Sequence, residues 1–123
     1  MPIVDIEVVS GAAVPGPTVQ ELADALGQVF GMPPGSIWVR VRPLDRAAYA
    51  ENGVYLGVGE LPVFVTVLRA NLPQGAALQA EVSAVTELVA QWVSRPPERV
   101  HVLYAPEGAG RQAFGGRLVK PRA

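Results

Sequence analysis

The spacing of apolar residues along the chain switches between alternation, which is typical of strands, and a period of three to four residues, which is typical of helices. They alternate with polar residues over 2–8 and again over 37–42, and both segments are predicted strands. Between them, apolar residues recur every three to four positions, which predicts a helix with Thr18 as its N-cap. The apolar stripe of this helix consists of Leu22, Ala25, Leu26, Val29 and Phe30, and Gly31, Pro33 and Pro34 end it.

The second half of the chain repeats this order. Segment 62–68 matches the first strand, a helix is predicted over 74–93, and a return strand over 100–104. The chain is therefore interpreted as one domain, 1–123, containing two copies of one unit, 1–61 and 62–123. A strand-helix-strand crossover makes its two strands parallel. Two such units predict an α/β fold with a four-stranded mixed sheet and two helices on one face.

The segments outside these units are predicted to form turns. Residues 47–56 favour a hairpin around Asn52 and Gly53, and residues 108–119 a mobile loop or short hairpin with a frayed end after it. Valine and isoleucine occupy much of both strand faces, so a single subunit would expose apolar sheet. We therefore expect an oligomer that packs these faces together.

Composition narrows the classes of partner and chemistry. The chain has 123 residues, 17% of them charged, and a formal net charge of -1, so no nucleic acid or membrane surface is expected as partner. Cysteine is absent and His101 is the single histidine, which argues against thiolate chemistry and a protein-built metal site; no cofactor is expected. No apolar run reaches the roughly 20 residues of a membrane span, and no signal pattern begins the chain, so a cytoplasmic location is expected.

The beginning of the chain carries the most specific candidate chemistry. Met1 precedes Pro2, and removal of the initiator methionine would expose a free secondary amine at the start of a strand. An unperturbed α-amino group titrates near pH ~8, close to where a general base works best. Many proteins begin with Met-Pro and make no use of the amine, so this motif alone does not establish catalysis.

Three features together resemble the tautomerase superfamily. They are the Met1-Pro2-Ile3-Val4 start, the duplicated strand-helix-strand unit, and a Pro-Pro-x-x-[Ile/Val]-x-Val pattern in both halves, at 33–39 and 96–102. The superfamily includes 4-oxalocrotonate tautomerase, macrophage migration inhibitory factor, 5-carboxymethyl-2-hydroxymuconate isomerase, the haloacrylate dehalogenases and malonate semialdehyde decarboxylase. The resemblance implies a homotrimer with sheets lining a central barrel. It also implies that the Pro2 amine, in a pocket at a subunit boundary, shuttles a proton in a small carboxylate-bearing substrate.

Candidate partners of Pro2 follow from the chemistry of a 2-keto acid. Arginine pairs with carboxylates and stabilises a developing enolate, and strand placement favours Arg40 and Arg69. His101 matches the position of an active-site tyrosine in the inhibitory factor and could donate to the substrate oxygen. Each could also be a residue without function: a surface arginine or a buried histidine. Further candidates for substrate binding are Trp38, Arg42, Tyr49, Phe114 and Arg117, with the aromatic residues as an apolar wall or as core and interface.

The chain departs from the family at several site positions. Met32 replaces the substrate-binding lysine of the inhibitory factor, Leu103 replaces a polar amide, and Phe114 falls where the cis-dehalogenase has a glutamate. Enol-keto tautomerisation of a small 2-keto or dienol acid needs the fewest extra groups and is the leading hypothesis. A hydratase- or dehalogenase-like activity would use the same proline with Glu107 or Glu51 near water. A non-catalytic trimer binding a small acid or a protein, or a ferredoxin-like sensing domain, remains open.

Overall fold

A computed structural model describes residues 2–11 and 18–121. Short 3-10 turns occur at Arg46–Ala48, Val58–Glu60 and Pro97–Arg99. The helices and strands, in chain order, are β1 (Ile3–Ser10), α1 (Val19–Val29), β2 (Trp38–Asp45), β3 (Val63–Leu68), α2 (Ala76–Val93), β4 (Val100–Tyr104), β5 (Ala113–Phe114) and β6 (Arg117–Leu118).

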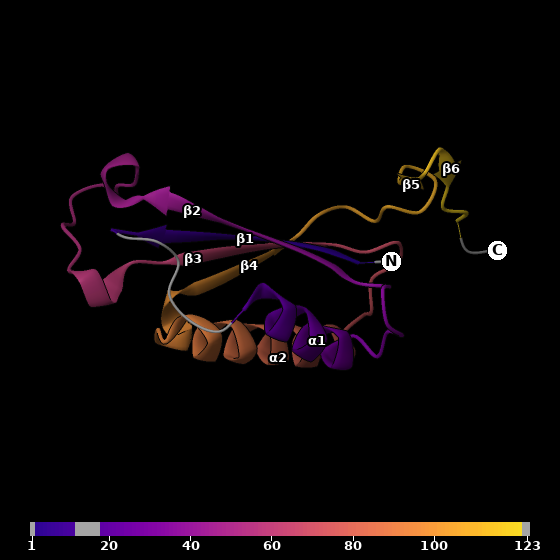
Figure 1. The fold of residues 1–123 in the computed structure, drawn as a ribbon, viewed down its shortest axis with the longest axis horizontal. Helices are drawn as coiled ribbons and strands as arrows, with labels where there is room; N and C mark the ends of the chain where they lie inside the picture. Colours follow the sequence, from indigo (N-terminus) through magenta and orange to yellow (C-terminus); the bar gives the residue numbers. More distant parts are fainter. Residues whose placement is uncertain (1, 12–17, 122–123) are drawn as a thin grey trace.

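The first four strands form one mixed sheet with the order β2-β1-β3-β4. β1 is parallel to β2 and β3 is parallel to β4, whereas β1 and β3 are antiparallel neighbours at the centre. Both helices lie against the same face of this sheet (Figure 1). The predicted four-stranded mixed sheet with two helices on one face is therefore confirmed. No helix within 2–11 and 18–121 is long and apolar enough to cross a membrane.

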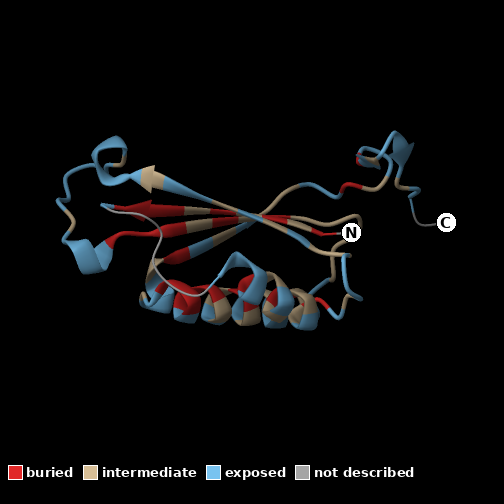
Figure 2. Cartoon of the chain, viewed as in Figure 1, coloured by how far each residue is buried: buried red, intermediate tan, exposed pale blue. Residues whose placement is uncertain are grey.

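The core lies between the sheet and the two helices. Alternate residues of the central strands are fully buried, and Figure 2 shows this burial concentrated in β1, β3 and the inner sides of the helices. Each buried valine, leucine or isoleucine contributes roughly 1.5–3 kcal/mol relative to an exposed position. The core residues include Val4, Ile6 and Val8 of β1, Val63, Val65 and Val67 of β3, Leu22 and Leu26 of α1, and Val85 and Val89 of α2.

The opposite face of the sheet is not covered by any described helix. Intervening strand residues point to this face because side chains alternate along a strand. Apolar side chains among them are exposed: Trp38 of β2 at 42% and Leu103 of β4 at 67%. Figure 2 shows exposed residues along β2, at the edge of the sheet.

Element boundaries differ from the sequence-based expectations by a few residues. β1 and β2 both continue further than their alternating patterns, because their parallel pairing extends to Ser10 and Asp45. α2 begins at Ala76 rather than near residue 74, since Gly75 precedes it with a positive φ of 56°.

The two predicted turn segments are short. Within 47–56, a single bridge joins Glu51 and Val54 around Gly53, whose φ is 75°. The tail forms the short hairpin of β5 and β6. The repeat boundaries at 61 and 62 stay a prediction.

Candidate active site

The pairing of the central strands places Pro2 beside Arg69. Ile3 of β1 lies opposite Leu68 of β3, so the next residue on each strand, Pro2 or Arg69, occupies the same end of the sheet. Pro2 is buried, and its carbonyl oxygen accepts a hydrogen bond from the backbone N–H of Trp38 at 3.1 Å. Pro2 shares the helix-facing side of β1 with the buried Val4.

Arg69 belongs to a compact polar cluster between this end of the sheet and the helices. Its Nη1 forms an ion pair with Oε1 of Glu81 on α2, and the hydroxyl of Tyr104 donates to Oε2 of the same carboxylate. The guanidinium carbon of Arg69 lies 5.4 Å from the ring centroid of Phe30, a cation-π arrangement. The Arg69 side chain is 21% exposed and that of Glu81 only 10%, so the pair is largely shielded from water.

The titration of Tyr104 reflects this environment. Burial raises the pKa of the Tyr104 hydroxyl well above its usual range, and the hydrogen bond to the Glu81 carboxylate raises it further. Tyr104 is therefore a neutral hydrogen-bond donor at any physiological pH. Because both oxygens of Glu81 are bonded, its carboxylate has one fixed orientation.

An aromatic pair lies at the same end of the sheet and joins β2 to the C-terminal tail, the described residues after β4. The rings of Trp38 and Phe114 meet edge to face, with centroids 4.9 Å apart. The indole N–H of Trp38 donates to the carbonyl of Gly35 at 3.2 Å, which fixes the ring. The tail follows β4 and is held beside the residue after β3, because the backbone N–H of Gly108 donates to the carbonyl of Arg69 at 2.8 Å. Figure 1 shows the β5–β6 hairpin beyond the end of the sheet that carries the N-terminus.

Arg40 lies on the uncovered face of the sheet and is already paired. Its Nε and Nη2 donate to the two carboxylate oxygens of Asp5 at 2.6 and 2.8 Å. The hydrogen bonds from Arg40 lower the pKa of the Asp5 carboxyl, against the opposing effect of burial. Arg42 is exposed on the same face and adds to this lowering through its charge.

Two further candidates lie toward the opposite end of the sheet. His101 contacts Phe64, with ring centroids 5.6 Å apart, and Phe64 in turn lies opposite Glu7. Since β1 rises about 3.3 Å per residue, His101 is roughly 16 Å along the sheet from Pro2. Tyr49 packs on Phe64 at 5.9 Å and donates to Glu51 at 2.6 Å.

The single chain thus brings together only part of the predicted set. Pro2, Arg69, Trp38 and Phe114 share one end of the sheet, with Pro2 and Arg69 on its helix-facing side and Trp38 on its uncovered face. Arg117 follows Phe114 in the exposed hairpin. Arg40, Arg42, His101 and Tyr49 do not join them within the chain, and their roles stay predictions.

Comparison by sequence finds no match, whereas comparison by structure finds several similar folds. No family model and no curated protein matches the sequence. Pt0534 inactivated by 2-oxo-3-pentynoate is 18% identical, with 94% of both chains covered and a TM-score of 0.72. A fused 4-OT described as an asymmetric trimer is 16% identical, with 94% of both chains covered and a TM-score of 0.69. Macrophage migration inhibitory factor from Oncomelania hupensis is 18% identical, covering 96% of this chain and 81% of that one, with a TM-score of 0.73.

The chain has the tautomerase-superfamily fold. The resemblance inferred from the Met-Pro start and the duplicated unit is confirmed at the level of the fold. Residue roles are a separate matter, because identities this low establish the fold alone.

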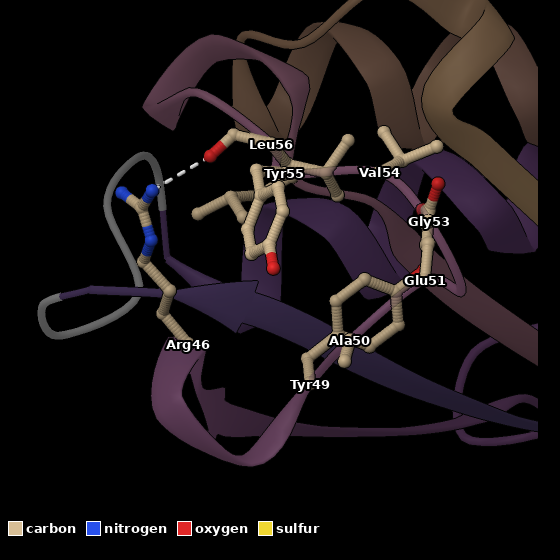
Figure 3. Close-up of a pocket in the computed structure, with 9 residues that line it drawn as sticks. Arg46, Tyr49, Ala50, Glu51, Gly53, Val54, Tyr55 and Leu56 are labelled. Carbon is tan, nitrogen blue, oxygen red and sulfur yellow. Dashed lines mark hydrogen bonds between the residues drawn. The ribbon is translucent and has the colours of Figure 1, made fainter.

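One pocket of the described chain lies away from Pro2. A pocket of about 390 Å³ is lined by the segment connecting β2 to β3, including Arg46, Tyr49, Glu51 and Tyr55 (Figure 3). Its charged groups already have partners: Arg46 donates to the carbonyl of Leu56 at 2.7 Å. Glu51 accepts from Tyr49 and from Arg99, and these bonds lower the pKa of its carboxyl. We place the candidate site at the Pro2 end instead, because Pro2 and Arg69 lie together there.

Sequence reasoning missed Glu81 and left Tyr104 undecided. A signal was present, because Glu81 lies one helical turn before Val85, on the face of α2 that carries the buried Val85 and Val89. Tyr104 likewise continues the inward positions of β4 that begin with Val100. A carboxylate on a buried helix face needs a partner, and Arg69, directly after β3, was a cation in reach of it.

Proposed function

We propose that the protein is a cofactor-independent tautomerase of a small 2-keto or dienol acid. The amine of Pro2, exposed by removal of Met1, acts as its general acid and base. The observation that carries this proposal is the buried position of Pro2 beside Arg69, at the end of the sheet where Trp38 packs on Phe114.

The reaction needs two proton transfers, and the Pro2 amine can carry out both. The neutral amine accepts the proton of the enol hydroxyl, and the resulting ammonium group delivers a proton to the substrate carbon. The carbon–carbon double bond becomes single, the carbon–oxygen bond becomes a carbonyl, and the amine returns to its neutral state. No cofactor is required by this balance, since one base serves both transfers.

Arg69 supplies the anchor for the substrate carboxylate. A guanidinium group has five N–H donors, and the described residues use only Nη1 of Arg69 in a hydrogen bond. The remaining donors suit a carboxylate or the enolate oxygen that develops next to it. The Arg69 side chain is partly exposed, so these unused N–H groups are within reach of a bound acid.

Trp38 and Phe114 supply the apolar side of the site. Trp38 is 42% exposed in the single chain, and burial of the uncovered face in the proposed trimer would exclude water around this pair. A site that excludes water favours the neutral form of an amine. A neutral amine at physiological pH is the form that can accept the enol proton.

The proposal includes a homotrimer. The uncovered sheet face exposes Trp38 and Leu103, which association would bury. The fused 4-OT relative is described as a trimer. Arg40, Arg42, His101 and Tyr49 would reach a Pro2 site only across a subunit boundary. Sedimentation equilibrium gives the subunit number directly, and a monomer would remove these four residues from the site.

The test measures ketonisation of an enol 2-keto acid by protein shown by intact mass to lack Met1. Met1-retaining protein and Pro2→Ala are run beside it. We expect turnover only by the processed protein. Turnover retained by both comparison proteins, or none by the processed protein, would reject the Pro2 mechanism for this substrate class.

The competing activities are separate arms of the same experiment. Addition of water to an unsaturated acid without ketonisation would favour a hydratase-like function. The structure favours tautomerisation, because both carboxylates considered for positioning water are engaged: Glu51 with Tyr49 and Arg99, and Glu107 with the backbone N–H of Leu72 at 2.6 Å. Binding of a small acid without any turnover would favour the non-catalytic reading.

Covalent labelling gives an independent readout. Pt0534 is inactivated by 2-oxo-3-pentynoate, an alkynyl 2-keto acid. In our proposal the Pro2 nitrogen adds to the alkyne, the triple bond becomes double, and the neighbouring carbon gains a proton. Peptide mass spectrometry would place the adduct on Pro2 in the processed protein, and labelling elsewhere would contradict the assignment.

A further inference from the structure

The guanidinium group of Arg69 is held in place by two other elements of the fold. Glu81 of α2 pairs with Nη1, and the ring of Phe30, at the end of α1, lies 5.4 Å from the guanidinium carbon. These contacts restrain one edge and one face of the group. A free arginine side chain at the end of a strand would instead sample many rotamers, and binding would then have to order it.

Glu81 is itself held by Tyr104. The Tyr104 hydroxyl donates to Oε2 of Glu81 while Oε1 receives the Arg69 bond. The Glu81 side chain is 10% exposed, so water cannot easily replace either partner. Three side chains, from the residue directly after β3, from α2 and from β4, therefore form one chain of bonds that ends on the guanidinium group beside Pro2.

We propose that Glu81 and Tyr104 are positioning residues, which fix Arg69 so that its unused N–H groups meet the carboxylate of a substrate beside Pro2. Neither residue touches the substrate; each acts through Arg69. The inference rests on the proposed function for the reaction that follows, but the binding of a carboxylate by Arg69 can be measured without turnover.

The chain offers matched controls for both positions. Glu87 lies on the same helix but is exposed, so Glu87→Gln makes the same change of charge as Glu81→Gln outside the cluster. Tyr55 is fully exposed, so Tyr55→Phe removes a hydroxyl without breaking a buried bond. Glu81→Asp keeps the charge and shortens the side chain, which tests geometry separately from charge.

The experiment compares two substrates with each processed variant. One is an enol 2-keto acid, and the other is the enol of a ketone that lacks a carboxylate. For the acid, we expect Glu81→Gln, Glu81→Asp and Tyr104→Phe to raise KM by about tenfold or more, with a smaller change in kcat. For the ketone and for both control variants, we expect no change. A purely structural role would impair both substrates alike, and that result would overturn the inference.

Titration with pyruvate, followed by calorimetry, separates this inference from the proposed function. If the wild type binds pyruvate and Glu81→Gln binds it about tenfold more weakly, the inference holds even when the enol acid is not turned over. If the wild type is active but Glu81→Gln matches Glu87→Gln in KM and in pyruvate affinity, the inference fails and the proposed function stands. If the wild type neither binds pyruvate nor turns over the acid, both fail. Should Glu81→Gln not fold, Tyr104→Phe decides by the same criteria.

Discussion

The Tyr104 hydroxyl can be removed from the polar cluster with little change of shape. Tyr104→Phe keeps the ring packed against the core and deletes only the donor to Glu81. A hydrogen bond to a charged group contributes about 1.5–3 kcal/mol, so we expect the free energy of unfolding to fall by about 2 kcal/mol. With a melting entropy of about 2.1 cal/mol/K per residue over 123 residues, this lowers Tm by about 8 °C.

The loss should depend on pH in a defined direction. The pKa of Tyr104 is raised above its ordinary value of 10.0, so the folded protein keeps a proton that the unfolded chain releases above pH 10. Rising pH therefore favours the unfolded state of the wild type, by about 1.4 kcal/mol between pH 8 and pH 11. Phenylalanine does not ionise. The deficit of Tyr104→Phe should shrink from about 2 kcal/mol at pH 8 to about 0.6 kcal/mol at pH 11.

Urea unfolding at pH 8 and pH 11, followed by circular dichroism, measures this difference. Urea leaves charge interactions unscreened, and a fixed protein concentration removes any contribution from association. Tyr55→Phe, at an exposed position, controls for the general effect of alkaline pH. An equal deficit at both pH values, or unfolding of Tyr104→Phe identical to the wild type at pH 8, would show that the Tyr104–Glu81 hydrogen bond does not stabilise the fold as described.

Three further changes have expected outcomes. Asp5→Asn should lower Tm at pH 7, because Arg40 holds the pKa of the Asp5 carboxyl below its ordinary value of 3.8. The higher Tm of the wild type should be fully present above pH 3.8 and disappear as pH falls through the lowered pKa. Thermal melts of both proteins between pH 2 and 7 measure this. Ser94→Gly should raise stability by roughly 0.5–1 kcal/mol, since Ser94 ends α2 with φ 55°, and calorimetry giving a lower Tm would contradict this. Phe114→Ala should release the tail from Trp38. We expect faster proteolysis within the tail and greater acrylamide quenching of Trp38 fluorescence than in Phe114→Leu. Equal proteolysis and quenching in the two variants would show that the ring contact does not hold the tail.

The fold was largely predictable because its periodicities are local. Alternation marked β1 and β2, and the stripe through Leu22 and Leu26 marked α1, each within a short window. The ends of the strands were less predictable. Ser10 and Asp45 belong to strands because they pair with each other, and this pairing depends on the packing of the whole unit.

The candidate site was predictable only for residues whose chemistry or position in a strand is visible in the sequence. Pro2 stood out by its chemistry, and Arg69 by its place at the end of a strand. Their proximity depends on the antiparallel register of β1 against β3, which the repeat alone does not specify. Alternation along the strands, applied to His101, would have placed its side chain on the uncovered face, whereas Pro2 lies on the helix-facing side.

The central position of β1 has a consequence for how the chain acquires its structure. β1 is synthesised first, yet its antiparallel partner is complete only at Leu68, so it cannot gain both neighbours until more than half of the chain exists. Pairings between segments so distant in sequence slow the search for the native topology. Until β3 arrives, one edge of a strand rich in valine and isoleucine is open to pairing with other chains. The strand that follows the candidate base is thus also a segment whose exposure during synthesis would favour aggregation.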